Sequence, residues 1–247
     1  MLLHQVPDAF PKSGGTLRAA ERICLYPRLS STGGPAAFQE KFALGLRKRG
    51  IDVCFDLNDR PYRSVLLIGG TRRLGDLRRA RRSGVPVIQR LDGMNWIHRR
   101  RRTGLAHFLR AEYGNLNLSY IRRRLADRIV YQSQFARHWW EGKSGLIEGP
   151  SEVIYNGVDL GVYNPDGPEA PPSDRWRILL VEGSLAGGYE VGLENAAELV
   201  RKLQPALRLP AELVVAGAVP EEVRARLDRQ ADTQIEWAGQ LPKDRIP

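Results

Sequence analysis

The sequence predicts an α/β protein made of two successive units, each a parallel sheet flanked by helices. Short apolar segments alternate with helical segments through most of the 247 residues, a rhythm typical of parallel sheets with crossover helices. A proline-rich stretch over 164–175 interrupts this rhythm and favours a linker between two domains. The strand–helix rhythm then restarts, which predicts a second unit of the same class.

The strands expected before the linker are short runs of apolar and β-branched residues. The first expected helix places Phe38, Phe42 and Leu46 on one face and ends at Gly50 after a run of cations. The predicted strands are 22–27, 51–55, 64–68, 85–91 and 127–131, and the other predicted helices are 72–83, 96–125 and one starting over 134–140.

After the linker the pattern is shorter. The predicted strands are 178–181, 213–216 and 235–237, and the predicted helices are 193–203 and 221–229. So small a parallel sheet would end on an uncovered edge, so we expect a second domain that is incomplete at Pro247. The expected organisation is an N-terminal extension (1–21), a Rossmann-like domain (22–164), a linker (165–175) and a partial Rossmann-like domain (176–247).

Composition excludes several classes of protein. Hydrophobic residues make up 42% of the chain, which is enough for a packed core. No run of about 18 apolar residues predicts a transmembrane helix, and the N-terminus lacks the basic-then-apolar order of a secretory signal. Cys24 and Cys54 lie in apolar runs, so we expect reduced core residues of a cytoplasmic protein. With two cysteines and four scattered histidines, no metal site is expected.

The formal net charge of +10 is concentrated in arginine clusters. The clusters lie in 72–82, 99–102 and 122–124. Such clusters attract phosphates on nucleic acid, anionic lipid or nucleotide-linked substrates, although arginines on solvated helices give the same pattern. Nucleic acid is disfavoured as a partner because interleaved aromatics, a zinc pattern and a helix-turn-helix signal are all missing.

The most informative motif runs from Val153 to Pro165 and reads VIYNGVDLGVYNP. A short strand over 153–155 leads into Asn156 and Gly157, residue types that tolerate positive φ, so a sharp turn is expected there. The motif resembles the V-I-x-N-G-V-D-x-x-x-F/Y-x-P signature at the interdomain hinge of family 4 glycosyltransferases (glycosyl transferases group 1), which have the GT-B fold.

This resemblance implies a GT-B protein with an acceptor-side first domain and a donor-side second domain. It implies a retaining glycosyltransferase that moves a sugar from a nucleotide-sugar donor to a saccharide, lipid-linked or other hydroxyl acceptor, without a metal or other cofactor. Asn156, Gly157 and Asp159 are then expected to bind substrate. Peripheral contact with an anionic inner membrane face is compatible, since each arginine near the leaflet adds about 1 kcal/mol.

Two further segments of the first domain resemble the same family. Gly33 and Gly34 follow the first strand, in the place of the glycine pair that opens family 4 transferases, and are expected to bind substrate. Helix N-terminal amides there would face the cleft, although a glycine-rich connection without a ligand is the alternative. The stretch 126–135 resembles A-D-x-I-V-x-x-S-x-F/Y, in which Ser133 is expected to cap a helix.

The loop after the fourth strand holds the expected catalytic residue. Many relatives place His-Gly here, and that histidine contacts the donor sugar; in this chain Asp92 falls at that position, followed by Gly93 and Asn95 as expected substrate-binding residues. A carboxylate there accepts hydrogen bonds from sugar hydroxyls or steadies an acceptor hydroxyl. The alternative is that Asp92 caps the next helix. Trp96 adds stacking surface or packs structurally.

The second domain departs from the family. Many members carry the motif G-R/N-x-x-x-x-K-G after the first strand of the second domain, and the Arg and Lys of this motif neutralise the donor pyrophosphate. In this chain Ser184 and Tyr189 fall about where those cations would be. Charge-assisted hydrogen bonds are about twice as strong as neutral ones, so the change weakens a phosphate site. Backbone amides at a helix start remain. The expected donor-phosphate residues are Gly183, Ser184, Gly187, Gly188 and Tyr189.

The missing cations leave a second hypothesis open. In it the chain is a non-catalytic or degenerate GT-B binding protein, which holds a sugar nucleotide without turnover.

Overall fold

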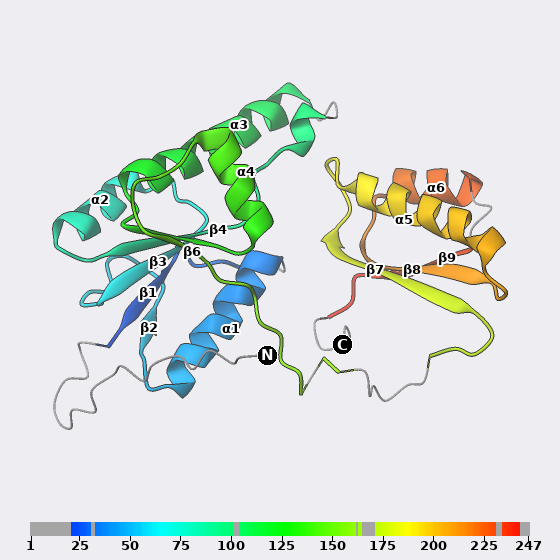
Figure 1. Cartoon of the computed structure of the whole chain (residues 1–247), viewed down its shortest axis with the longest axis horizontal. Coiled ribbons are helices and arrows are strands. Elements are labelled where there is room, and N and C mark those ends of the chain that lie inside the picture. Colours follow the sequence, from blue (N-terminus) through cyan, green and yellow to red (C-terminus); the bar gives the residue numbers. More distant parts are fainter. Residues whose placement is uncertain are drawn as a thin grey trace.

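The computed structural model describes residues 21–30, 33–100, 104–161, 163–164, 171–230 and 234–242. Of the expected N-terminal extension only Glu21 belongs to this part, and 165–170 of the expected linker lie outside it. The described residues form two separate parallel sheets flanked by helices, one on each side of the linker (Figure 1). The predicted α/β class is confirmed.

The first sheet has the strand order β2-β1-β3-β4-β5-β6, and all its pairings are parallel. Its strands are β1 (Ile23–Tyr26), β2 (Val53–Cys54), β3 (Ser64–Ile68), β4 (Val87–Leu91), β5 (Arg128–Tyr131) and β6 (Ser151–Val153). Its helices are α1 (Gly34–Lys48), α2 (Leu74–Arg82), α3 (Leu105–Arg124) and α4 (Gln134–Ser144), with a 3₁₀ turn η1 (Ile97–Arg99). β1 lies inside the sheet, with β2 on one side of it and β3 to β6 on the other. The crossover helices therefore cover both faces, and α1 lies on the opposite face from α2 and α3 (Figure 1).

Local sequence explains where the helices of the first unit begin and end. α1 starts after Gly33 with a proline in its first turn, and the chain leaves it through Gly50 at φ +78°. Ser133 accepts a hydrogen bond from the Ala136 N–H at 3.0 Å, so its predicted role as the α4 cap is confirmed. The helix predicted over 96–125 was too long, because Gly104, at φ +86°, separates η1 from α3.

The expected sharp turn at Asn156 and Gly157 was wrong. β6 ends at Val153, residues 154–159 contain no turn, and Gly157 is absent from the described glycines with positive φ. The Asn156 side chain instead accepts a hydrogen bond from a buried arginine of β4. The chain turns later, where the Asp159 carboxylate accepts from the Gly161 N–H at 3.0 Å.

The core of the first unit lies on both faces of its sheet. On one face Cys24, Val65 and Leu67 pack with residues of α2 and α3, and on the other Leu25 packs with Ala43 of α1. Both cysteines are buried and free, as predicted.

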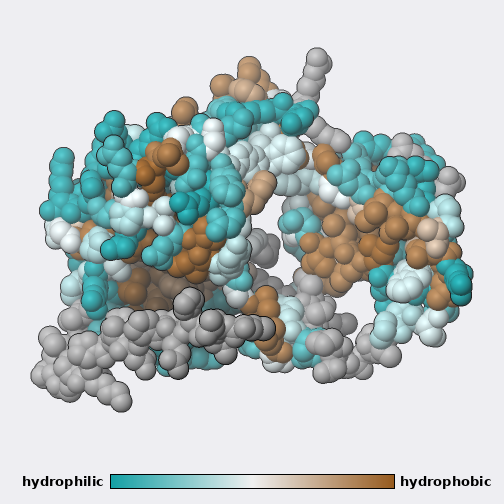
Figure 2. Space-filling model, in the orientation of Figure 1, coloured by the Kyte–Doolittle hydropathy of each residue, from teal (hydrophilic) through white to brown (hydrophobic). Residues whose placement is uncertain are grey.

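The second sheet has the order β7-β8-β9 and is again parallel. Its elements are β7 (Trp176–Ser184), α5 (Glu190–Leu203), a 3₁₀ turn η2 (Gln204–Ala206), β8 (Ala211–Ala218), α6 (Glu221–Gln230) and β9 (Gln234–Gly239). One face carries a core in which Leu213 and Val215 pack with Leu193 of α5 and Leu227 of α6. Leu179 and Val181 of β7 are exposed, and Figure 2 shows apolar surface gathered over this sheet.

Candidate active site

The loop after β4 carries Asp92 and is fixed by two helices. The indole N–H of Trp140 on α4 donates to the Asp92 carbonyl oxygen at 2.7 Å. The Asn115 side chain on α3 accepts from the Asn95 N–H at 3.0 Å and donates to the Asn95 carbonyl at 2.8 Å. The next helical turn begins at Ile97 without a side-chain cap, so the alternative in which Asp92 caps a helix was wrong. Asp92 instead stands at the carboxyl edge of the sheet, where α/β proteins bind ligands.

Three aromatic rings beside this loop form a stacking surface. The ring centroids of Trp96 and Trp139 lie 6.3 Å apart, and Phe135 meets Trp139 edge-on at 5.1 Å. Trp96 is 44% exposed, so its ring is accessible to a ligand. A Cβ on Gly93 would lie 3.8 Å from Trp139, so this glycine packs closely beside the rings. Such amphipathic rings suit a ligand with apolar faces and several hydroxyls.

A cavity of about 500 Å³, here called the acceptor-side cavity, opens between this loop, α3 and α4. It is lined by aromatic, amide and cationic side chains, and its one lining carboxylate belongs to α3. The residues used below are Asn95, Trp96, Arg99, Arg100, Glu112, Leu116, Arg123, Trp139 and Lys143.

The side chains that line this cavity carry a net positive charge, because its one carboxylate is already paired with a cation. Arg99 donates to Glu112 at 2.6 and 2.7 Å, and the buried His98 ring lies 2.7 Å from the same carboxylate. These contacts, Arg99 first and His98 second, lower the pKa of Glu112 to about 2. The other three lining cations have no ion-pair partner among the described residues, so the cavity suits an anionic ligand.

Arg90 on β4 is a buried cation at the same edge of the sheet. It is 4% exposed, and its Nη2 donates to Gln132 at 3.1 Å and to the Asn156 side chain at 2.8 Å. Phe38 of α1 covers the guanidinium at 3.8 Å. Burial lowers the pKa of Arg90, an effect that Asp92 opposes. No carboxylate of the described residues forms an ion pair with Arg90, and a buried cation without such a pair marks a candidate anion site.

The expected substrate-binding residues of the hinge lie in different surroundings. Asn156 is tied to Arg90 and therefore belongs to the edge of the first sheet. Gly157 is exposed, and a Cβ added to it would meet no atom within 4 Å. Asp159 is engaged in its own turn, since its carbonyl oxygen also accepts from the Tyr163 N–H at 2.8 Å.

Gly33 and Gly34 lie at the carboxyl end of β1, at the start of α1. Gly33 precedes the helix and its carbonyl accepts from the N–H groups of Ala36 and Ala37, both at 3.1 Å. A Cβ on Gly34 would meet no atom within 4 Å, so the backbone is open to a ligand. Ser31 and Thr32 of the same expected loop lie outside the described residues.

The expected donor-phosphate loop joins β7 to α5, and a carboxylate accepts a hydrogen bond from one of its glycine amides. Gly187 and Gly188 have φ values of +68° and +103°, so both positions favour glycine. The Gly188 N–H donates to the Glu190 carboxylate at 2.7 Å. An anion at a helix N-terminus is stabilised by the helix dipole, and in this structure that anion is the Glu190 carboxylate.

The other residues of this loop offer little positive charge. Gly183 donates its N–H to the Glu182 carboxylate at 2.9 Å, and Ser184 is the last residue of β7. Tyr189 precedes α5 and is exposed. A phosphate bound here would therefore meet glycines, two hydroxyl groups and two carboxylates.

The donor-side loop and the loop after β4 approach each other closely. A Cβ on Gly188 would lie 3.0 Å from Cγ1 of Ile97, so a larger residue would crowd η1. Figure 1 shows the turn between β7 and α5 directed toward the first unit. The contact brings the neighbourhoods of Asp92 and Gly188 together, although they lie far apart in the sequence.

Among the described residues no group of three or more His, Cys, Asp and Glu side chains is placed to hold a metal ion. In the same residues no helix combines the length and apolar character needed to span a bilayer.

Comparison with known proteins supports the fold. No protein-family model and no curated protein matches the sequence. Among solved structures, Anabaena Alr3699/HepE in complex with UDP-glucose matches with a TM-score of 0.53 and 13% identity, covering 90% of this chain and 69% of that chain. The same protein in complex with UDP matches with a TM-score of 0.53 and 15% identity, covering 90% and 70%. The chain therefore has the GT-B fold, as the sequence predicted.

Sequence reading missed three features of this site. Arg90 had a detectable signal, because it is the single cation of a short strand, VIQRL. Glu190 had none, because acidic residues are common in the first turn of any helix. The three cavity arginines had a partial signal, since they belong to arginine clusters, but their grouping with Lys143 around one hollow depends on how α3 packs against α4.

Proposed function

We propose that this chain is a glycosyltransferase that moves a sugar from a nucleotide-sugar donor to a hydroxyl acceptor with retention of configuration. The observation that carries the proposal is the approach of Gly188 to Ile97, which brings a glycine loop at a helix start opposite a carboxylate-bearing loop with the exposed Trp96. The HepE structures with the same fold hold UDP-glucose and UDP, which supports a nucleotide-sugar donor.

In this proposal the donor phosphates lie between the two units. The amides of Gly187 and Gly188 contact them from the second unit, after the Glu190 carboxylate has moved away. Arg90 supplies the positive charge from the first unit, because Nη2 makes both of its hydrogen bonds and the other guanidinium nitrogens remain for an anion. Gly33, Gly34 and Asn156 lie along the same strand edge and complete the binding surface.

The acceptor occupies the acceptor-side cavity in this proposal. Its ring stacks on Trp96 and Trp139. Asp92 lies outside the cavity lining, at the end of β4, and its carboxylate accepts a hydrogen bond from an attacking hydroxyl that extends out of the cavity. The acceptor oxygen bonds to the anomeric carbon as the bond to the leaving phosphate oxygen breaks. The hydroxyl proton passes to that phosphate oxygen on the same face. A cytoplasmic location, where nucleotide sugars are the available donors, and the absence of a metal requirement belong to the same proposal.

A binding protein without turnover is the second candidate, and a specific observation favours it. The β7–α5 loop has no cation and has Glu190 on the amide that a phosphate would use. Calorimetric binding of UDP-glucose without release of UDP would support this candidate.

The direct test is release of UDP from UDP-glucose by the full chain and by Asp92→Asn, with and without saccharide acceptors. We expect the wild type to release UDP and Asp92→Asn to retain binding while turnover falls about a hundredfold. Glu152→Gln, an exposed change outside the cavity, is the control. Unchanged turnover in Asp92→Asn would contradict the role of this carboxylate.

A further inference from the structure

The outer face of α3 carries an apolar stripe that no described residue covers. The stripe consists of Leu105, Leu109, Tyr113, Leu116 and Tyr120, with exposed fractions of 75, 60, 53, 68 and 37%. Spacings of three and four residues place all five on one side of the helix. The opposite side is buried against the first sheet through residues such as Ala111 and Ile121. A surface helix that is apolar on both sides indicates an interaction surface.

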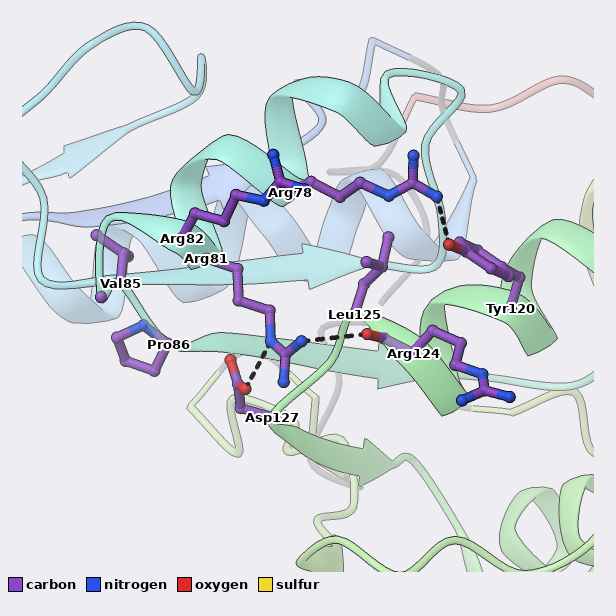
Figure 3. A pocket seen from close by; sticks show the side chains of 10 residues that line it. Arg78, Arg81, Arg82, Val85, Pro86, Tyr120, Arg124, Leu125 and Asp127 are labelled. Atoms are coloured by element: carbon purple, nitrogen blue, oxygen red, sulfur yellow. Dashed lines mark hydrogen bonds and ion pairs between the residues drawn. The ribbon is translucent and has the colours of Figure 1, made fainter.

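On one side of the α3 stripe lies a basic hollow of about 650 Å³, here called the α2–α3 hollow (Figure 3). Arg78 of α2 reaches the Tyr120 hydroxyl, so the end of the stripe forms part of its wall. Arg81 donates to Asp127 at 2.9 Å and to the Arg124 carbonyl at 3.3 Å. Arg82 and Arg124 also line the hollow, and neither has an ion-pair partner among the described residues.

The acceptor-side cavity lies on the other side of the α3 stripe. Leu116 belongs both to the stripe and to the lining of that cavity. The cavity contributes Arg100, Arg123 and Lys143, again without ion-pair partners in the described part of the chain. The stripe is therefore an apolar ridge between two cationic hollows.

Charge complementarity identifies the partner of this surface. The carboxylates lining the two hollows are Asp127 and Glu112, and each is already neutralised by an arginine. The remaining charge is positive on both sides of the ridge. A second copy of the chain would bring these cationic flanks together, and a soluble phosphate would leave the ridge exposed. A bilayer with anionic headgroups can bury the apolar ridge and pair with the cationic flanks at the same time.

We propose that the α3 stripe docks this protein on an anionic lipid bilayer. The five apolar side chains enter the headgroup boundary, and the arginines of both hollows contact lipid phosphates. Tyrosines at such a boundary keep the ring in the apolar layer and the hydroxyl in water. Together with the proposed function, this docking places the mouth of the acceptor-side cavity at the membrane and selects a lipid-linked acceptor.

The test is flotation of the full chain with phosphatidylcholine vesicles that contain or lack phosphatidylglycerol, without any nucleotide. We expect binding to the anionic vesicles only, and weaker binding as salt rises. Arg82→Gln with Arg124→Gln should lower the partition coefficient about thirtyfold, at about 1 kcal/mol for each arginine. Leu105→Ser with Leu109→Ser should lower it roughly tenfold or more.

Matched controls exist on the second unit. Leu199→Ser with Leu203→Ser changes two exposed leucines one turn apart on α5, and Arg208→Gln with Arg229→Gln changes two exposed arginines. Both control pairs should bind vesicles as the wild type does. Circular dichroism of all variants confirms that the helices remain folded.

Three outcomes would overturn the proposal. The first is equal binding of the wild type and both stripe and hollow variants. The second is a wild-type dimer in light scattering that the leucine pair disrupts, which would assign the ridge to a second copy. The third is binding of inorganic pyrophosphate that depends on Arg82 and Arg124, together with no binding of the protein to vesicles. Flotation does not depend on turnover, so the two proposals can fail separately. If only the transferase proposal fails, the protein binds vesicles but releases no UDP.

Discussion

The two sides of the candidate cleft differ in charge, and the difference is opposite to the one that the family resemblance implies. The side formed by the first unit has a buried Arg90, two tryptophans and three cavity cations that have no ion-pair partner among the described residues. The side formed by the second unit has glycines, an exposed Tyr189 and a carboxylate bound to the Gly188 amide. In the proposed function, the positive charge for a diphosphate therefore comes from the first unit, while the second supplies backbone amides.

The largest expected effect comes from removing the buried cation. Arg90→Gln keeps an amide that can still contact Asn156 but loses the charge, so UDP release from UDP-glucose should fall about a hundredfold, the equivalent of losing one to two charge-assisted hydrogen bonds. The rate of UDP release by Arg90→Lys should lie between those of the wild type and Arg90→Gln, since lysine keeps the positive charge but lacks the planar guanidinium.

The exposed Arg128 on β5 provides the control for that change. Arg128→Gln should leave UDP release unchanged. If Arg90→Gln remained folded by circular dichroism and released UDP at the wild-type rate, the charge would have to come from elsewhere, and the comparison between the two units would be wrong.

The next effect concerns the aromatic surface of the first unit. Trp139→Ala removes a ring that contacts both Trp96 and Phe135, and we expect acceptor KM to rise about tenfold while donor binding stays the same. Trp176→Ala, an exposed tryptophan on β7, is the matched control. Equal increases in acceptor KM for both variants would contradict a stacking role.

A smaller effect of opposite sign is expected from the second unit. Glu190→Gln removes the negative charge from the start of α5 and weakens the hydrogen bond from the Gly188 amide, so UDP-glucose should bind about fivefold more tightly. Isothermal titration measures the change, and Glu194→Gln, one turn later on the same helix, tests whether position matters. Weaker binding in Glu190→Gln would show that this carboxylate helps to hold the donor.

The smallest effect is one of stability, at the ion pair that lines the acceptor-side cavity. Arg99 and His98 lower the pKa of Glu112 from the ordinary 4.5 to about 2, so this contact stabilises the fold above pH 4.5 and the stabilisation is lost as pH falls toward 2. Glu112→Gln should lower the free energy of unfolding by about 1 to 2 kcal/mol at pH 7. Denaturant unfolding between pH 2 and 7 measures it, with Glu152→Gln as control; parallel pH profiles would contradict the assignment.

The sequence predicted the parallel sheets well because apolar strands and helix stops are local signals. Gly50 after a cationic run ended α1 as expected, and Ser133 capped α4. It failed where tertiary contacts decide. The Asn156 side chain is held by Arg90, 66 residues earlier, which overrides the local tendency of Asn-Gly to turn. The place of Asp92 at a strand end was readable, whereas the capture of the Gly188 amide by Glu190 depends on side-chain geometry.

The central claim is that the first unit provides the charge that binds the donor, and calorimetric titration of UDP-glucose into three proteins tests it most directly. The account predicts measurable binding by the wild type, binding about a hundredfold weaker for Arg90→Gln and about fivefold tighter for Glu190→Gln. Binding of equal strength in all three proteins would contradict the account, and so would binding that depends on Glu190 alone.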